Sequence, residues 1–202
     1  MKLFKEVTAK AAGIFLVMVV VCGVLYTLLM TGVGQLFFKD KANGSIIEVN
    51  GVKYGSELIG QRFTKPEHLW GRIVLPDTGS FTDSEGNPAV YAWASNKTPA
   101  GEELEGIIAE RVAAIKESNP DAATESIPVE LVTVSGSGLD PHISPAAAEY
   151  QVPRIAKERG ISEDEVRTVI DRYTDGKLFG ILGEKTVNVL EVNLALDGIL
   201  QE

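Results

Sequence analysis

A loop of hydroxyl, carboxylate and imidazole side chains lies between two apolar segments of the sequence. Ser137, Asp140 and His142 are the residue types of a serine hydrolase, in which a histidine takes the proton of the attacking hydroxyl. The G-x-S-x-G elbow is absent, because glycines stand immediately on both sides of Ser137. Triad members on one short loop also seldom converge in space. We therefore favour a tight glycine turn with His142 bonded to the backbone, and a membrane-anchored hydrolase using Ser137 and His142 is the alternative.

The same loop holds the candidates for phosphate binding. Backbone N–H groups around Ser135 and Ser137 could form an anion nest. Neither a P-loop string nor a dinucleotide fingerprint occurs in the chain. We predict no metal site, because His68 and His142 are far apart and Cys22 is the only cysteine, so no zinc spacing exists.

An uncharged apolar segment near the N-terminus predicts a membrane span. Residues 11–38 contain no charged side chain, and about 20 such residues in a helix cross the roughly 30 Å hydrocarbon layer. A cleaved signal peptide is the alternative, but its apolar core is usually about 7–15 residues and an A-x-A-like site is missing. We expect a cytoplasmic N-terminus at 1–10, a transmembrane helix region at 11–38 and an extracytoplasmic domain at 39–202.

Charge sets the expected orientation and excludes one class of partner. Three lysines and one glutamate precede the span, whereas the rest of the chain holds 27 of the 28 acidic residues and 16 of the 19 Lys and Arg. Basic residues beside a first span favour the cytoplasmic side, so we place the acidic domain outside a single-pass cell-membrane protein. An acidic domain without a basic patch also excludes nucleic acid as a partner.

The domain begins with a predicted hairpin and an irregular stretch. Apolar residues flank Asn50-Gly51, a pair that tolerates the positive φ angles of a type I′ turn. The following residues, to about Pro99, lack periodicity and contain both tryptophans, Trp70 and Trp93. We expect irregular structure with aromatic anchors there.

Helices and separated strands follow. A helix is predicted over 104–115, a second from a Ser144 cap to a Gly160 stop, and a third from a capping box of Ser162 and Glu165. Alternating apolar residues predict strands over 129–134 and 187–193. This order favours an α+β soluble domain attached to one N-terminal transmembrane helix.

Several sequence strings resemble one protein family, the C subunit (KdpC) of the bacterial Kdp potassium-transporting P-type ATPase. The strings are G-S-E-L-I-G-Q at 55–61, W-G-R at 70–72, Ser95-Asn96, V-E-L-V-T-V-S-G-S-G-L-D-P-H-I-S-P-A-A-A at 129–148 and V-N-V-L-E-V-N-L-A-L-D at 187–197. They keep the family's order across nearly the whole chain. This chain departs from the family around 73–99, where Ile73-Val74 replaces the usual Pro-Ser.

The resemblance implies a non-catalytic accessory subunit of an ATP-driven potassium importer. Its partners would be a channel-like potassium-binding subunit, which handles potassium, and a P-type ATPase subunit, within a lipid bilayer. The family is described as a catalytic chaperone that raises the ATP affinity of the ATPase subunit and contacts ATP. An extracytoplasmic domain cannot reach cytoplasmic ATP, so ATP binding is expected only if the domain is an ATP-binding module on the cytoplasmic side. The matching strings also supply candidates for docking or structural roles: Trp70, Arg72, Ser95, Asn96, Asp140, His142, Asn188 and Asn193.

Overall fold

The computed structural model describes residues 2–74, 76–77, 82, 86, 91–92, 94–122 and 126–200 of the chain. Trp93, predicted as an aromatic anchor, lies outside the described residues, as does much of the divergent 73–99 stretch. Contacts divide the chain into two compact units, residues 1–46 and 47–202. We describe each unit by itself.

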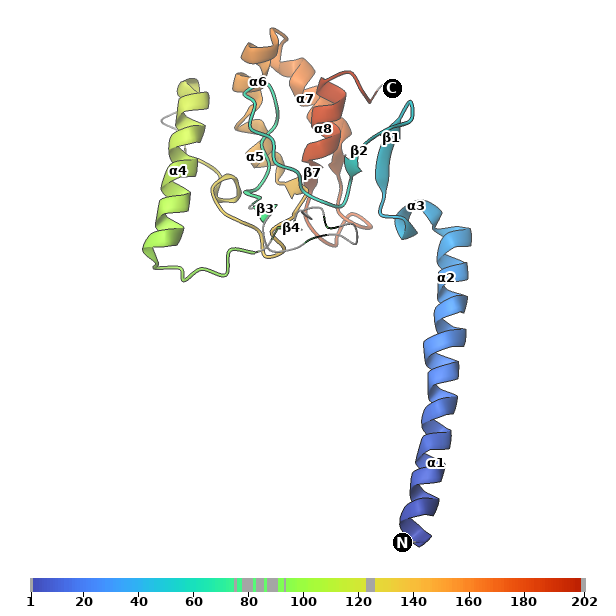
Figure 1. Ribbon diagram of the computed structural model, residues 1–202. Helices are drawn as coiled ribbons and strands as arrows, with labels where there is room; N and C mark the ends of the chain where they lie inside the picture. The colour runs from blue at the N-terminus through green and yellow to red at the C-terminus, as the bar shows by residue number, and fades with distance from the viewer. Residues whose placement is uncertain are drawn as a thin grey trace. The chain divides into compact units, whose positions relative to one another are not determined.

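The first unit is one long apolar helix and a short one (Figure 1). Helix α1 (Lys2–Met18), a π-helical stretch (Val19–Leu25) and α2 (Tyr26–Phe37) run on without a break, and α3 (Lys39–Ala42) follows. Residues Phe4–Phe37 form the single described helix that is long and apolar enough to cross a membrane. Its 34 residues rise by about 50 Å, which exceeds the thickness of the hydrocarbon layer. The apolar helix predicted from the sequence is present, and among the described residues it is the one candidate for a membrane span.

The second unit starts with the predicted hairpin. Strands β1 (Ile46–Val49) and β2 (Val52–Ser56) pair around Asn50 and Gly51. These two residues have φ angles of 53° and 77°, as a type I′ turn requires. A short antiparallel pair, β3 (Pro76–Asp77) with β4 (Tyr91–Ala92), follows in the chain.

A three-stranded antiparallel sheet and four helices form the body of the unit. The strand order is β5 (His142–Ile143), β7 (Thr186–Asn188), β6 (Thr174–Asp175). The helices are α5 (Pro145–Glu149), α6 (Val152–Arg159), α7 (Glu163–Arg172) and α8 (Val189–Leu196), and Figure 1 shows α6, α7 and α8 grouped beyond one end of β7. Helix α4 (Glu102–Ser118) precedes two 3₁₀ turns, Pro120–Ala122 and Val129–Leu131. The α+β class is confirmed.

The core lies between this sheet, the helices and the irregular segment that contains Leu69 and Trp70. Leu69 is fully buried although it belongs to no helix or strand. The other large side chains with almost no exposure come from the C-terminal part of the unit: Leu131, Ile143, Val152, Ile155, Val166, Val187, Val192 and Asn193. The irregular segment is therefore part of the core.

The helix ends follow local sequence rules. Ser144 caps α5 by accepting the Ala147 N–H, and the Ser162–Glu165 capping box of α7 is complete in both directions. Gly160 ends α6 in the left-handed conformation, with φ of 66°.

Three predicted elements are wrong in type or extent. The helix expected from Ser144 to Gly160 is two helices, because Pro153 lacks the N–H that would continue the ladder across the gap between α5 and α6. Of the strand expected over 129–134, residues 129–131 are a 3₁₀ turn and only Val134 forms an isolated β-bridge, with Ile73. The adjacent residues Leu131 and Val132 are both buried, a pattern that a half-buried strand cannot produce.

The third correction concerns 187–193. Only Thr186–Asn188 is a strand, and α8 starts at Val189. The Asn188 side chain accepts the Glu191 N–H and so caps the helix. Side chains on more than one face of α8 are buried, so apolar residues are needed around most of the helix. Some of them therefore stand two positions apart, which is the spacing expected of a strand.

Candidate functional site

The hydroxyls of the 135–139 loop hold the loop itself together. Ser135 Oγ accepts the Gly138 N–H at 2.8 Å and lies 3.2 Å from Ser137 Oγ. Ser137 Oγ accepts the Leu139 N–H at 3.2 Å. Both hydroxyls are therefore engaged in a local turn of the kind that serines stabilise. The predicted tight glycine-containing turn is present.

Asp140 joins this loop to two other segments. Its Oδ1 accepts the His142 N–H at 3.0 Å and lies 3.9 Å from His142 Nδ1. Its Oδ2 lies 3.6 Å from Arg72 Nη1, and Arg72 Nη2 donates to the Val134 carbonyl at 3.2 Å. The Arg72 side chain thereby links the W-G-R string to both sides of the serine loop.

Gly60 explains part of the G-S-E-L-I-G-Q string. Its N–H donates to the Leu139 carbonyl at 2.7 Å, so the two segments touch through their backbones. A Cβ atom at Gly60 would lie 2.5 Å from the Asp140 carbonyl oxygen. Only glycine permits this approach.

The loop geometry does not suit the chemistry first considered for it. Within the described residues, no hydrogen bond joins Ser137 to His142, and the hydroxyl that would attack is bonded inside its own turn. The hydrolase alternative is not supported.

A phosphate cradle fits the loop poorly as well, because the N–H groups of Gly138 and Leu139 already donate to the serine hydroxyls. His142 was expected to bond to the backbone, but among the described contacts its ring lies 3.9 Å from Asp140 Oδ1 and its own N–H donates to the same carboxylate.

Two side-chain amides clamp the backbone of the buried irregular segment. Asn193 accepts the Leu69 N–H at 2.7 Å and donates to the Leu69 carbonyl at 2.9 Å. Gln151 does the same for the Trp70 N–H and carbonyl, at 2.8 and 3.0 Å. Buried backbone groups without strand partners need such replacements. Asn193 was predicted as a candidate because it belongs to the 187–197 string. Gln151 was not predicted. The one sequence signal for Gln151 is a side-chain amide placed between two helices with apolar faces.

Two arginines stack on the Trp70 ring. The Arg111 and Arg154 guanidinium carbons lie 4.8 and 4.7 Å from the ring centroid, within cation–π range. Burial, then the nearby Arg111 charge, lowers the pKa of Arg154 to about 10, so it stays protonated at neutral pH. Burial, then the Arg62 charge, also lowers the pKa of Arg111.

A cleft of about 290 Å³ opens beside this stack, between α4 and the segment that follows β2. Its charged lining consists of Arg62, Arg72, Arg111 and Glu110. Arg111 itself donates to the Leu131 and Gly71 carbonyls at 3.0 and 3.2 Å. At least part of this positive charge therefore serves to fasten α4 to the body of the unit.

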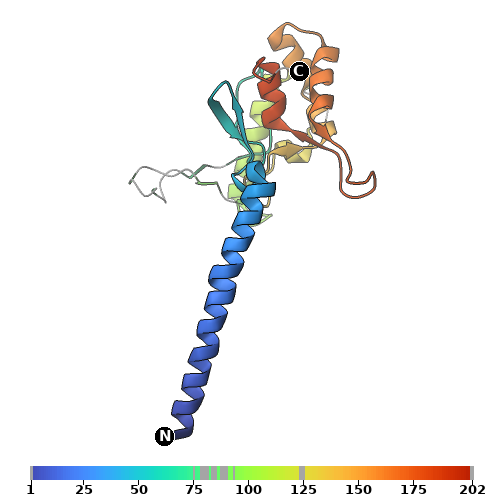
Figure 2. The ribbon, with the colours of Figure 1, turned by 90° about the vertical axis from the view of Figure 1, so that its right-hand side faces the viewer.

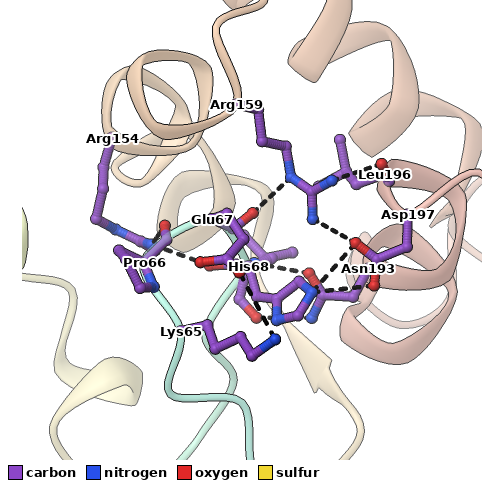
Figure 3. Close-up of polar contacts among 10 residues, drawn as sticks. Lys65, Pro66, Glu67, His68, Arg154, Arg159, Asn193, Leu196 and Asp197 are labelled. Carbon is purple, nitrogen blue, oxygen red and sulfur yellow. Dashed lines mark hydrogen bonds and ion pairs between the residues drawn. The ribbon is translucent and has the colours of Figure 1, made fainter.

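A second polar cluster, shown in Figure 3, fastens the same segment to α6 and α8. His68 Nε2 lies 3.0 Å from Asp197 Oδ2, and Arg159 Nη2 donates to Asp197 Oδ1 at 2.6 Å. Arg159 Nε also donates to the Glu67 carbonyl at 2.6 Å. Burial raises the pKa of Asp197, but the hydrogen bonds from Arg159 and His68 outweigh it, and the net pKa is lowered. Sequence reasoning missed this cluster, because its members are far apart in the chain and only Asp197 belongs to one of the matching strings.

The remaining candidates divide between this framework and a separate surface. Asn188 is buried and donates to the Glu57 carbonyl at 2.8 Å, which ties β7 to the G-S-E-L-I-G-Q string. Ser95 and Asn96 instead line an open surface hollow with the first turn of α4, apart from the other candidates. Five of the eight candidates thus hold segments together: Trp70, Arg72, Asp140, Asn188 and Asn193. His142 contacts Asp140 within its own loop.

No cluster of three or more His, Cys, Asp or Glu side chains suited to a metal ion occurs in the part of the chain that the structure describes.

The known proteins that this chain resembles belong to one family. The family model for "KdpC: K+-transporting ATPase, c chain" matches residues 8–198. A potassium-transporting ATPase KdpC subunit of Clostridium botulinum is 56% identical over 201 residues, covering 100% of both chains. That of Clostridium perfringens is 55% identical over 197 residues, covering 98% of this chain and 100% of the relative. The Paraburkholderia phytofirmans subunit is 47% identical over 184 residues, covering 91% and 92%. The chain belongs to the KdpC family of potassium-transporting ATPase subunits.

Proposed function

We propose that this chain is the non-catalytic accessory subunit of a Kdp potassium importer, with its N-terminus in the cytoplasm and its α+β domain outside. The observation that carries the proposal is family membership over the whole chain together with one apolar helix of 34 residues. The proposed partners are a channel-like potassium-binding subunit and a P-type ATPase subunit, which handle potassium and ATP. The asymmetry of charge around the span supports the orientation.

The framework of hydrogen bonds supports a structural role for the domain. Its buried polar side chains bind backbone groups of the same chain: Asn193 binds Leu69, Gln151 binds Trp70, and Asn188 binds Glu57. Side chains used in this way produce a rigid body that can present a fixed surface to partners. In this proposal the domain stabilises the assembly, and catalysis belongs to the ATPase subunit.

Protease accessibility in intact cells tests the orientation. Added protease is expected to remove the domain while the N-terminal ten residues, carrying an epitope tag, stay protected. A cytoplasmic protein serves as the control for cell integrity. Protection of the domain, with digestion only after the cells are opened, contradicts the proposed orientation.

The proposal includes the chaperone role in a restricted form: the subunit raises the ATP affinity of the ATPase subunit through the assembled complex, without holding the nucleotide itself. The occupied N–H groups of the serine loop favour this form over direct contact. The KM for ATP of the complex is expected to rise when the subunit is removed. An azido-ATP photoprobe is expected to label the ATPase subunit and not this chain, and specific labelling of this chain contradicts the restricted form.

A further inference from the structure

Helix α4 is attached to the second unit along a small part of its surface. Figure 1 shows it standing at one edge of the unit, and in the side view of Figure 2 it lies behind other elements. Ile115 is the one buried residue among the 17 of α4, all of which the structure describes. A hollow of about 290 Å³ lies along this attachment. We define it as the arginine cleft, lined by residues 62–64 and 70–74 and by Ile107, Glu110, Arg111 and Ala114 of α4.

Apolar side chains form much of the wall of the arginine cleft. They come from the segment after β2 and from α4: Phe63, Trp70, Ile73, Val74, Ile107 and Ala114. Water beside such walls is released when the apolar body of a ligand takes its place, and this release is favourable. The cleft therefore suits a ligand that is apolar over part of its surface.

Arg62 brings a positive charge to the arginine cleft that no described residue neutralises. It is exposed, and it makes no hydrogen bond or ion pair within the part of the chain that the structure describes. Arg111, by contrast, donates to the Leu131 and Gly71 carbonyls. Burial, followed by the charge of Arg62, lowers the pKa of Arg111, so the two cations repel each other. This repulsion opposes folding and leaves Arg62 available to an anion.

The described charges around the arginine cleft leave an excess of one positive charge. Three arginines line the cleft together with one carboxylate, that of Glu110. A second carboxylate, that of Asp140, lies outside the lining and pairs with Arg72 at 3.6 Å. Arg72 Nε is in addition buried without a hydrogen-bond partner among the described residues. This local excess contrasts with the net charge of −9 on the whole chain, and it favours an anion that carries a single charge.

The charge and the size of the arginine cleft together define the class of ligand. A guanidinium fork matches the two oxygens of a carboxylate. A nucleoside triphosphate would instead bring several negative charges close to Glu110 and Asp140. Pockets for small molecules span about 300–1,000 Å³, so a cleft of about 290 Å³ suits a small molecule. A stable protein partner would need about 800 Å² of contact on each side, more than a hollow of this size offers.

We propose that the arginine cleft binds a small organic monocarboxylate with an aromatic or branched apolar body. The carboxylate pairs with Arg62, and the apolar body contacts Phe63 and Ile107. The bound anion joins α4 to the segment after β2 and offsets the repulsion between Arg62 and Arg111. This site is separate from the transport role proposed above, and ligand binding requires no other subunit.

Fluorine NMR with a simple probe tests the site in the full chain. The probe is para-trifluoromethylbenzoate, added to the protein in a nonionic detergent, and its signal is compared with that in micelles alone. We expect saturable binding, at least tenfold tighter than that of the neutral para-trifluoromethylbenzyl alcohol. Equal binding of the acid and the alcohol, or no saturation, overturns the inference. ATP at the concentration of the probe is expected not to displace it, and displacement overturns the assignment to a monoanion.

Matched substitutions separate a ligand-binding role of Arg62 from a structural one. Arg62→Gln is expected to bind the probe at least tenfold more weakly, whereas Arg167→Gln, which removes the same charge from a surface helix, binds it like the wild type. Arg62→Gln is also expected to keep or raise the urea midpoint of unfolding, because Arg62 repels Arg111. Unchanged probe binding in Arg62→Gln, or equal weakening in both variants, overturns the inference. A lower midpoint of Arg62→Gln without the probe shows a structural role and overturns it as well.

Discussion

Asn193 and Leu69, which are 124 positions apart, are joined by a reciprocal pair of hydrogen bonds between one side-chain amide and one backbone residue. Asn193 is completely buried in α8, and Leu69 is completely buried in a segment without regular structure. The amide supplies the donor and the acceptor that a neighbouring strand would otherwise provide. The irregular segment can therefore cross the core without unpaired backbone groups.

Replacing Asn193 tests this pairing directly. Asn193→Leu keeps the approximate size but leaves the Leu69 N–H and carbonyl buried without partners, which costs about 2–4 kcal/mol. We expect the unfolding free energy of the full chain in detergent to fall by that amount, measured by urea unfolding with tryptophan fluorescence. Asn193→Asp should also destabilise, because it removes the donor and buries a charge. Wild-type stability in both variants contradicts the clamp.

Arginine geometry at Trp70 gives a second prediction. Arg154 donates to the Pro66 and His68 carbonyls and to Gln151 while it stacks on the ring. A lysine cannot reproduce this planar fork, so Arg154→Lys is expected to lower the unfolding free energy by about 2–3 kcal/mol.

The control for Arg154→Lys is Arg167→Lys. Arg167 binds only exposed carboxylates, of Glu149, Glu163 and Asp164 among the described contacts. Surface ion pairs contribute about 0–1 kcal/mol, so this variant should unfold almost like the wild type. Equal effects of the two substitutions would show that stacking and burial at Trp70 add nothing.

Asp197 predicts a dependence of stability on pH. Its folded pKa lies below the ordinary value of about 3.9, so its ionised form stabilises the fold at neutral pH. This contribution is lost as the pH falls through the folded pKa, below about 4. Asp197→Asn should destabilise the chain at pH 7 by about 1 kcal/mol, a modest effect because solvent screens a carboxylate that is one-third exposed.

The difference between wild type and Asp197→Asn is expected to shrink when unfolding is measured between pH 4 and pH 2. Asp164→Asn is the matched control, since the Asp164 side chain is 93% exposed. A difference that stays constant across this pH range contradicts the assigned role of the carboxylate.

Gly60 and Gly136 allow a test of the close contact between the G-S-E-L-I-G-Q string and the serine loop. A Cβ at Gly60 meets the Asp140 carbonyl oxygen at 2.5 Å, whereas a Cβ at Gly136 meets nothing within 4 Å. Neither residue has a positive φ angle. Gly60→Ala should lower the unfolding free energy by about 1–3 kcal/mol and Gly136→Ala should have little effect, measured as shifts of the urea midpoint. A neutral Gly60→Ala would mean that the two segments do not touch as described.

Local signals in the sequence predicted the structure correctly where that structure depends on residues close together in the chain. The uncharged run from Ala11 to Phe38 predicted the span, Asn50-Gly51 predicted the hairpin turn, and the Ser162–Glu165 box predicted the start of α7. The turn and the capping box depend on neighbours within about one β-turn or one helical turn, and the span depends on one continuous stretch of sequence. The strings at 129–148 and 187–197 likewise pointed to the family.

The tertiary structure decided what depends on segments distant in the chain. Residues 187–193 alternate like a strand, yet α8 forms because Asn188 caps it and its apolar side chains are buried on more than one face. Gln151 gained its role only when Trp70 was placed beside it. The serine loop that suggested catalysis is a turn locked to Arg72 and Gly60. Sequence by itself determined the family, the span and the local turns, whereas packing alone decided which polar groups pair, because a hydrogen-bond partner 80 or more positions away leaves no local pattern.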